Sequence, residues 1–217
     1  MGSLMPSGAV TAPTIEQFSR SAPDRAAFWT WFSEEIAPMG VDGLDDDTLI
    51  GQIDAQLRQV HQDLGFELWG PEDGVVHFVI SADGLMPLFE EVIELVRSAP
   101  DMPGWEIVAF RPRRPVSAKI QALDTVISGD QIWYNFEPED GRLRLALFID
   151  GDEAGNWDMM CAATGVLLEM ALGEFDAATM IARLEYCPLT PEIQSLGLKP
   201  LRDLADDVDQ FFGTACH

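Results

Sequence analysis

Lysine is nearly missing from this 217-residue chain, which contains only Lys119 and Lys199. With arginine included, there are 13 basic residues against 37 acidic ones, a formal net charge of −24. Nucleic acids and anionic membranes carry charge of the same sign, so a surface this acidic repels them and favours basic partners. The sequence therefore predicts no nucleic-acid partner and no membrane partner, and a basic protein is the partner that the charge suits.

Cysteine is also scarce, with three residues at positions 161, 187 and 216 and no CxxC pair. An odd number of widely spaced cysteines is typical of free thiols in a reducing compartment rather than of a disulfide framework. The N-terminus lacks a basic stretch followed by an apolar run, and no apolar run is long enough to cross a bilayer. We therefore expect a cytoplasmic protein.

Recognisable catalytic and cofactor signatures are missing as well. The chain contains no GxSxG or SxxK nucleophile motif, no GxGxxG or GxxxxGK[ST] phosphate loop and no HExxH zinc motif. The acidic stretch at 150–158 resembles a calcium loop, but it lacks oxygen ligands at the fifth and twelfth positions of an EF-hand, so we interpret it as a solvated turn and helix cap. The sequence predicts no cofactor and no metal, and it leaves enzymatic activity open with a preference against it.

What the chain does contain is an internal repeat. The sequence Pro-Glu-Asp-Gly occurs at 71–74 and again at 138–141. Apolar residues then alternate in both copies, and each copy ends on Asp-Gly, at 83–84 and, with the same offset, at 150–151. Alternation of this kind is typical of a strand with one buried face, so the repeat predicts a duplicated β-hairpin.

Hydrophobic residues make up 47% of the chain, enough to build a substantial core. Their spacing predicts the following elements, in chain order: helices at 24–40 and 45–64, strands at 65–70 and 75–81, a helix at 84–98, strands at 105–110, 131–137 and 142–149, a helix at 157–172, a strand at 180–186 and a helix at 198–212. Within this pattern we expect Ile50 and Leu85 to face the core. Helix 157–172 is apolar nearly all round and should be buried on several sides.

These elements predict an α+β fold of two tandem ββαβ units with antiparallel sheets, related to ferredoxin-like folds, preceded by a helical pair and closed by a C-terminal helix. We expect residues 1–22 to form a flexible N-terminal arm, 23–114 the first unit, ααββαβ, and 115–217 the second unit, ββαβα. The two units should pack as one compact body. The pattern leaves open whether their sheets join side by side or lie face to face.

Two motifs of the first half resemble a family. An FWxWF run at 28–32 and a GWxxxAFxPR run at 104–113 are similar to motifs of a functionally uncharacterised bacterial α+β family. The resemblance covers roughly residues 25–115. It implies an α+β fold and transfers no catalytic residue to this chain.

An arginine cluster follows the second of these motifs. Arg111, Arg113 and Arg114 lie among prolines that favour an extended backbone, and alternation would point Arg111 and Arg113 the same way. Two guanidinium groups on one side are suited to a carboxylate or a phosphate. The alternative interpretation is that they pair with carboxylates of this protein.

Three further residues complete the candidate ligand set. His77 alternates with the apolar stripe of its strand, and Arg144 is its counterpart in the second copy of the repeat, so both belong to the second face of a sheet. Trp29 falls off the apolar face of its helix, which favours contact with a ligand or partner.

Three hypotheses of function follow. The first is a non-enzymatic protein-binding module whose acidic surface binds a basic protein. The second is a site for an anionic small molecule, enzymatic or not, between the two half-sheets with Arg111, Arg113, Arg144 and His77 nearby. The third is a homo-oligomeric scaffold that assembles through exposed sheet edges.

Overall fold

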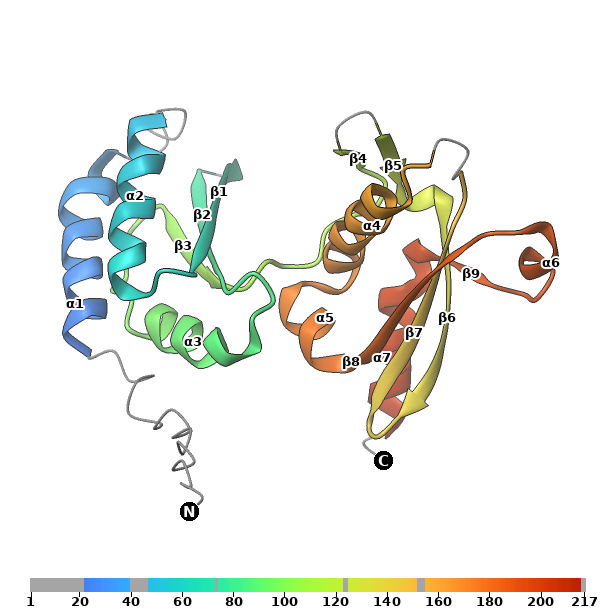
Figure 1. Ribbon diagram of the computed structural model, residues 1–217. Helices are drawn as coiled ribbons and strands as arrows, with labels where there is room; N and C mark the ends of the chain where they lie inside the picture. The colour runs from blue at the N-terminus through green and yellow to red at the C-terminus, as the bar shows by residue number, and fades with distance from the viewer. Residues whose placement is uncertain (1–21, 40–46, 73, 123–124, 152–154, 216–217) are drawn as a thin grey trace, which may run out of the picture.

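The structure, a computed structural model, describes residues 22–39, 47–72, 74–122, 125–151 and 155–215 (Figure 1). All but the last residue of the expected flexible arm at 1–22 lies outside these ranges. The described chain contains two separate hydrophobic cores, one built from residues between Phe28 and Phe110 and the other from residues between Val116 and Val208. We call residues 22–110 the N-lobe and 116–215 the C-lobe. Residues 111–115 are the linker between them.

The N-lobe is a three-stranded sheet covered on one face by helices. Its elements are α1 (Ala22–Trp31), a π-helical turn (Phe32–Ile36), α2 (Asp47–Val60), β1 (Gly65–Glu72), β2 (Val75–Ser81), a 3₁₀ turn (Met86–Leu88), α3 (Phe89–Arg97) and β3 (Trp105–Ala109). Each predicted helix and strand of this half is therefore present; β2 has its predicted bounds, and the other elements differ at one or both ends.

Three expectations about buried positions in the N-lobe are wrong. Ile50 is 38% exposed, and Leu49 (4%) takes the place in the core one turn before Ile53. Leu85 is 48% exposed because the chain turns helical only after it, at the 3₁₀ turn. Trp29 is only 3% exposed, and its indole N–H donates to the Leu95 carbonyl oxygen at 2.8 Å. The aromatic run is so dense that residues beside the predicted face are buried too.

The C-lobe is larger and carries a four-stranded sheet. Its elements are β4 (Lys119–Ala122), β5 (Thr125–Ser128), a 3₁₀ turn (Gly129–Gln131), β6 (Ile132–Glu139), β7 (Arg142–Ile149), α4 (Trp157–Leu172), α5 (Glu174–Met180), β8 (Ile181–Pro188), α6 (Pro191–Gln194), β9 (Lys199–Pro200), a 3₁₀ turn (Leu201–Asp203) and α7 (Leu204–Ala215). The β4–β5 hairpin, α5, α6 and β9 were not predicted, because each is too short to show a period.

Both sheets contain parallel strands, which corrects the expectation of antiparallel sheets. β1 and β2 are antiparallel, and β3 returns after α3 to lie parallel beside β2. The C-lobe repeats this order, with β6 antiparallel to β7 and β8 parallel to β7 after α4 and α5. A helical crossover brings the chain back in its original direction. In a ferredoxin-like split βαβ unit another strand separates the parallel pair, whereas here the two are direct neighbours.

The offset found in the sequence is present in the strands. β1 begins at Gly65 and β6 at Ile132, and the starts of β2 and β7 are separated by the same interval. Next to the two turns the register is also equivalent, since Glu72 pairs with Val75 and Glu139 pairs with Arg142. A β-bulge between Trp69 and Glu72 then shifts the rest of the first hairpin.

α4 is the central helix of the C-lobe and matches its predicted bounds. One side packs into the core with the sheet and α7, and the β4–β5 hairpin contacts another side, as expected for a helix that is apolar nearly all round. Val166 on α4 is nevertheless 50% exposed and faces the space between the lobes. Among the described residues, no helix is both long and apolar enough to cross a membrane.

Candidate functional site

The linker leaves the N-lobe through a sharp change of backbone direction. Phe110 has a φ of 67°, in the left-handed region, and this ends β3. The Glu174 N–H then donates to the Arg111 carbonyl oxygen at 3.0 Å, which ties the linker to the C-lobe. Residues 111–115 therefore do not form a strand, and the alternation that would point Arg111 and Arg113 the same way does not apply.

Arg111 lies at the centre of a cluster of carboxylates from both lobes. Its Nε donates to Glu67 on β1 at 2.7 Å, one Nη to Asp83 at 2.6 Å and the other to Glu169 on α4 at 3.2 Å. Burial opposes the charge of Arg111, but the hydrogen bond to Asp83 and the charge of Glu169 outweigh it and raise its pKa. Burial in turn raises the pKa of Glu169, and the charge of Arg111 offsets this only in part.

The hydrogen-bond partners of the Arg113 side chain all belong to the C-lobe. It donates to both oxygens of Asp209 on α7 at 2.7 and 2.8 Å, to Asp176 on α5 at 2.7 Å and, through Nε, to the Leu172 carbonyl oxygen at 3.1 Å. The hydrogen bond to Asp209 is the main reason that the pKa of Arg113 is raised. The interpretation that the cluster pairs with the protein's own carboxylates is confirmed.

Arg114 lies at one end of a stack of rings on the face of the N-lobe sheet opposite the helices, which we call its outer face. Its guanidinium lies 5.4 Å from the centroid of the Trp69 ring and donates to Glu67 at 2.7 Å. Trp69 stacks on His77 with ring centroids 4.0 Å apart, and His77 Nδ1 lies 3.0 Å from a Glu106 oxygen. The buried indole nitrogen of Trp69 has no hydrogen-bond partner among the described residues. Arg114 and Trp69 therefore form a cation–π contact beside the Glu67 carboxylate.

A carboxylate that the sequence did not single out joins the lobes. Glu174, at the start of α5, is 1% exposed and accepts hydrogen bonds from the backbone N–H groups of Ala82 (2.8 Å), Gly84 (3.1 Å) and Arg111 (3.1 Å). Asp83 and Gly84 have φ angles of 49° and 74°, and this left-handed turn directs its N–H groups toward one point. One acidic residue in a chain with 37 gives no signal that would have identified it.

An aromatic cluster lies next to this carboxylate. Phe175 of α5 packs against Phe89 and Phe110 of the N-lobe, with ring centroids 5.5 and 5.3 Å apart. The contact between the lobes therefore combines packed rings, of which Phe89 and Phe110 are buried and Phe175 is 43% exposed, with hydrogen-bonded charges.

Two adjoining hollows form a groove between β1 and α4, which we call the interlobe groove. One has a volume of about 510 Å³ and is lined by Glu67, Arg111, Pro112, Arg114, Ile120, Val166, Glu169 and Met170. The other has a volume of about 640 Å³ and is lined by Trp69, Pro112, Arg113, Arg114, Pro115, Ser117, Ala118 and Met170. Both share Pro112, Arg114 and Met170, so they are continuous along the linker. Two carboxylates (Glu67 and Glu169), three arginines of the linker, Trp69 and several apolar side chains line this groove.

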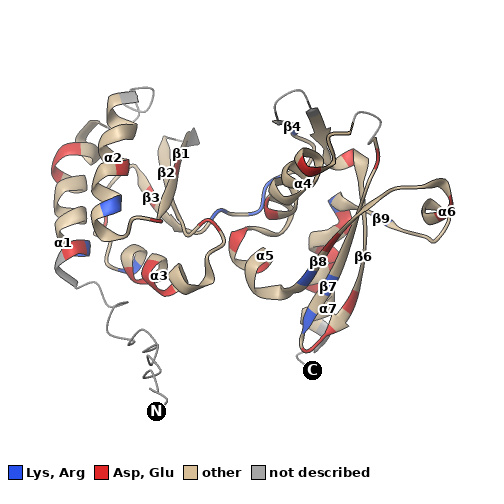
Figure 2. Ribbon diagram, viewed as in Figure 1, with Lys and Arg blue, Asp and Glu red and all other residues tan. Residues whose placement is uncertain are grey.

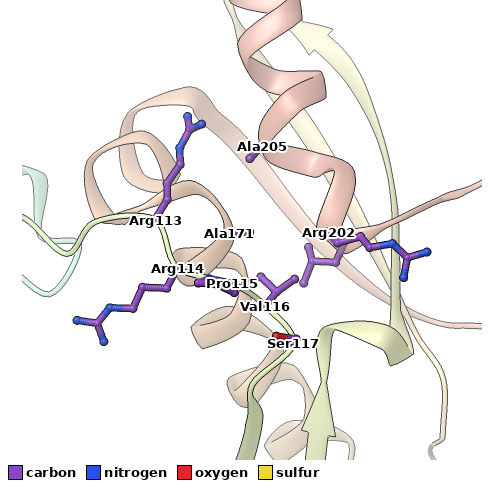
Figure 3. Close-up of a pocket in the computed structure, with 9 residues that line it drawn as sticks. Arg113, Arg114, Pro115, Val116, Ser117, Ala171, Arg202 and Ala205 are labelled. Atoms are coloured by element: carbon purple, nitrogen blue, oxygen red, sulfur yellow. The ribbon is translucent and has the colours of Figure 1, made fainter. Parts of the chain in front are cut away.

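A further hollow of about 420 Å³ is bordered by Arg113, Arg114 and Arg202. Figure 3 shows that these three side chains point in different directions, and Arg113 extends away from the hollow. The middle is lined by Ala171, Leu201 and other apolar residues. Arginines that diverge in this way do not grip one anion.

The remaining predicted ligand residues lie apart. Arg144 is on the C-lobe sheet and pairs with Glu137, whereas His77 is on the N-lobe sheet beside Trp69. Trp29 is inside the N-lobe core. The structure thus brings Arg111, Arg113 and Arg114 near the groove, with His77 behind Trp69, and it does not bring Arg144 or Trp29 to that place.

Acidic and sulfur side chains form no candidate metal centre in the described part of the chain, which contains no group of three His, Cys, Asp or Glu placed to hold an ion. Residues 152–154 of the calcium-like stretch lie outside that part. Within the described residues, Cys161 and Cys187 are not joined in a disulfide bond, in agreement with the expectation for those two residues.

Comparison with known proteins found no matching family model, no matching curated protein and no matching solved structure.

Proposed function

We propose that the protein is a non-enzymatic binding module that holds an extended, basic segment of a partner protein in the interlobe groove. The observation that carries this proposal is the pairing of the basic residues of the N-lobe and the linker. Residues 23–114 contain 18 acidic and six basic side chains, a net charge of −12. All six bases, Arg25, Arg58, Arg97, Arg111, Arg113 and Arg114, pair with carboxylates of this chain. Residues 23–114 therefore present a net negative charge to a partner.

The walls of the groove suit a chain segment in extended conformation. β1 is one of the two edge strands of its sheet, and Figure 1 shows it on the side nearest α4. An edge strand offers backbone hydrogen bonds to an added strand, while neighbouring side chains select the sequence. Ile120, Val166 and Met170 give the opposite wall an apolar surface.

The Arg114 contact supports a basic occupant. This guanidinium already lies over Trp69 and donates to Glu67, so the groove contains one example of the interaction that a partner's arginine would make. The net negative charge of the surrounding surface would also speed association with a cationic protein.

Calorimetry with a short arginine-rich peptide tests the proposal, with a peptide of equal length rich in glutamate as the control probe. We expect binding of the basic peptide only, and a marked loss of affinity as the Debye length falls from about 30 Å at 0.01 M salt to about 8 Å at 0.15 M. Salt-independent binding, or no binding at low salt, would contradict it.

A pair of variants locates the binding site. Val166→Arg places a cation on the groove wall at a position that is 50% exposed, so folding should be unaffected. Leu196→Arg adds the same charge at a position 75% exposed between α6 and β9 of the C-lobe. We expect Val166→Arg to weaken peptide binding about tenfold, which corresponds to about 1.4 kcal/mol, and Leu196→Arg to leave it nearly unchanged. Equal effects would show that the peptide does not use the groove.

An anionic small molecule in the same region has less support. Arg111 and Arg113 are saturated by carboxylates, and Arg144 lies on another sheet. Inorganic phosphate that raised the melting temperature in the wild type, and not in Arg113→Ala, would favour this second function.

Related proposals concern origin and compartment. The equal offset of both hairpins and the same strand–strand–helix–strand order support descent of the two lobes from one duplicated ββαβ unit. Membership of the uncharacterised bacterial family indicated by the FWxWF run stays a proposal. Cys161 and Cys187 form no disulfide bond in the described part of the chain, which supports a reducing cytoplasm as the compartment.

A further inference from the structure

The C-lobe sheet has one face that does not belong to its core. Along β7, the residues Leu143, Leu145, Leu147 and Ile149 are at most 1% exposed, so the alternate residues Arg142, Arg144, Ala146 and Phe148 lie on the opposite face. Those four are partly or fully exposed. We call this surface the outer face of the C-lobe sheet.

Strand register arranges the outer face in rows. Phe148 pairs with Trp133 on β6 and with Cys187 on β8, which gives an apolar row at one end. At the other end the residues are charged: Arg144 pairs with Glu137 on β6 and with Arg183 on β8. All of these side chains are at least partly exposed.

This face is electrically balanced on a strongly acidic molecule. It carries three acidic residues, Glu137, Glu139 and Glu185, and three basic ones, Arg142, Arg144 and Arg183. The chain as a whole has a net charge of −24. Figure 2 shows the two colours together on β7 and β8, whereas α1 and α3 carry mainly acidic residues. Two copies of the chain repel each other over most of their surfaces, and this face is a place where they approach with little repulsion.

An arm at the apolar end enlarges the surface. Residues 189–198 leave the sheet after β8, form the short α6 and return to β9, where Pro200 pairs with Trp133. In Figure 1 the arm projects from the sheet on the side away from α4. Leu196 on this arm is 75% exposed, so it adds apolar area to this end of the surface.

We propose that the outer face and its arm form a self-association surface whose occupant is a second copy of this chain. A two-fold axis parallel to β7 exchanges β6 and β8, so Glu137 of each copy comes to lie over Arg183 of the other. The arm of each copy then covers apolar residues of its partner. This surface is separate from the interlobe groove, so the inference does not depend on the proposed function.

The size of the surface sets the expected strength. β6, β7 and β8 have eight residues each. With a rise of about 3.3 Å per residue and strands about 4.8 Å apart, they cover roughly 370 Å² per copy. Stable interfaces bury about 800 Å² per partner, so the sheet alone gives a weak dimer and the arm is needed to strengthen it. We expect a reversible dimer with a Kd in roughly the micromolar range.

Sedimentation velocity of the full chain over a range of concentrations tests this. The wild type should shift from monomer to dimer as concentration rises, and Leu196→Arg should raise the dimer Kd at least about tenfold. Val166→Arg, on the groove wall, is the matched control and should dimerise as the wild type does. A wild type that stays monomeric at about 100 μM, far above a Kd in the micromolar range, would overturn the proposal, and so would equal effects of the two variants.

Charge reversal tests the geometry of the contact. Glu137→Arg and Arg183→Glu should each weaken the dimer, because like charges then meet across the axis. The double variant that carries both changes should dimerise again, and so should an equimolar mixture of the two single variants. Failure of both to recover would exclude the proposed stacking of β6 on β8 even if a dimer forms.

Discussion

The two lobes share a strand order and a charge, yet their sheets differ in what covers the outer face. Residues 23–114 and 115–217 each contain 18 acidic and six basic residues. In the N-lobe, Val79 and Ser81 on the outer face of β2 are completely buried. Their counterparts in the second copy of the repeat, Ala146 and Phe148, are partly exposed. The same strand order therefore has a covered outer face in the N-lobe and a partly exposed one in the C-lobe.

The linker explains the difference. The side chain of Arg111 reaches from the end of β3 to Glu67 on β1, and so it passes over the strand between them. Arg114 and Trp69 extend this cover. Within the described residues no equivalent arginine segment follows β8, where the chain continues into the α6 arm. Duplicated units can thus acquire different roles through the segments that follow them.

The largest effect we predict separates the two cores. Phe78 and Leu145 are equivalent positions in the repeat, with exposed fractions of 0% and 1%. Phe78→Ala should destabilise the protein by about 3–5 kcal/mol and Leu145→Ala by about 2–5 kcal/mol, since each leaves a cavity. Hydrogen exchange followed by mass spectrometry should show faster exchange in the N-lobe for the first variant and in the C-lobe for the second. Faster exchange in both lobes for either variant would mean that they unfold as one unit.

A smaller loss should follow removal of the carboxylate that joins the lobes. Glu174→Ala leaves three backbone N–H groups without their acceptor, and we expect a loss of roughly 3 kcal/mol in the free energy of unfolding by urea. Glu174→Gln keeps one oxygen acceptor and should lose less. Glu34→Ala, on an exposed turn, serves as the control. If Glu174→Ala matched that control, the contact would not hold the lobes together.

Sequence patterns predicted the elements better than their contacts. Helix 157–172 matches α4 because its long apolar run fixes both ends, and the paired hairpins follow from alternation and turn residues. Patterns along the chain do not report which strands become neighbours, so the parallel pairing of β2 with β3 was missed.

The candidate site was predicted only in part, for a reason of composition. A cluster of three arginines is conspicuous in a chain with few basic residues and indicated a site. Arg111 and Arg113 do lie at the contact between the lobes. The carboxylates that pair with these arginines could not be predicted, because Asp and Glu are so common in the chain that the sequence distinguishes no single one. Burial is what distinguishes Glu174 from the other carboxylates, and burial depends on the tertiary fold.

The smallest predicted effect is on the pH dependence of stability. It compares Glu169, which pairs across the two lobes, with Asp209, which belongs to the C-lobe. Burial raises the pKa of Glu169 in the folded protein. Its contribution to stability is therefore greatest below the unfolded pKa of about 4.3 and is lost as pH rises through the folded pKa. The hydrogen bond from Arg113 instead lowers the pKa of Asp209, whose contribution is present above about 3.9 and is lost as pH falls through its folded pKa.

Urea unfolding from neutral pH to about pH 3 separates these two contributions. Relative to wild type, Glu169→Gln should be more stable at neutral pH, since glutamine resembles the protonated acid, and the advantage should disappear on acidification. Asp209→Asn should be less stable at neutral pH, and its disadvantage should disappear at the acid end. The effects have opposite signs because Glu169 is half-buried on the groove wall, with 31% of its side chain exposed, whereas Asp209 is exposed at 56% and keeps its solvation beside Arg113. If both variants changed stability in the same direction, burial at the groove wall would not be what sets the ionisation of Glu169.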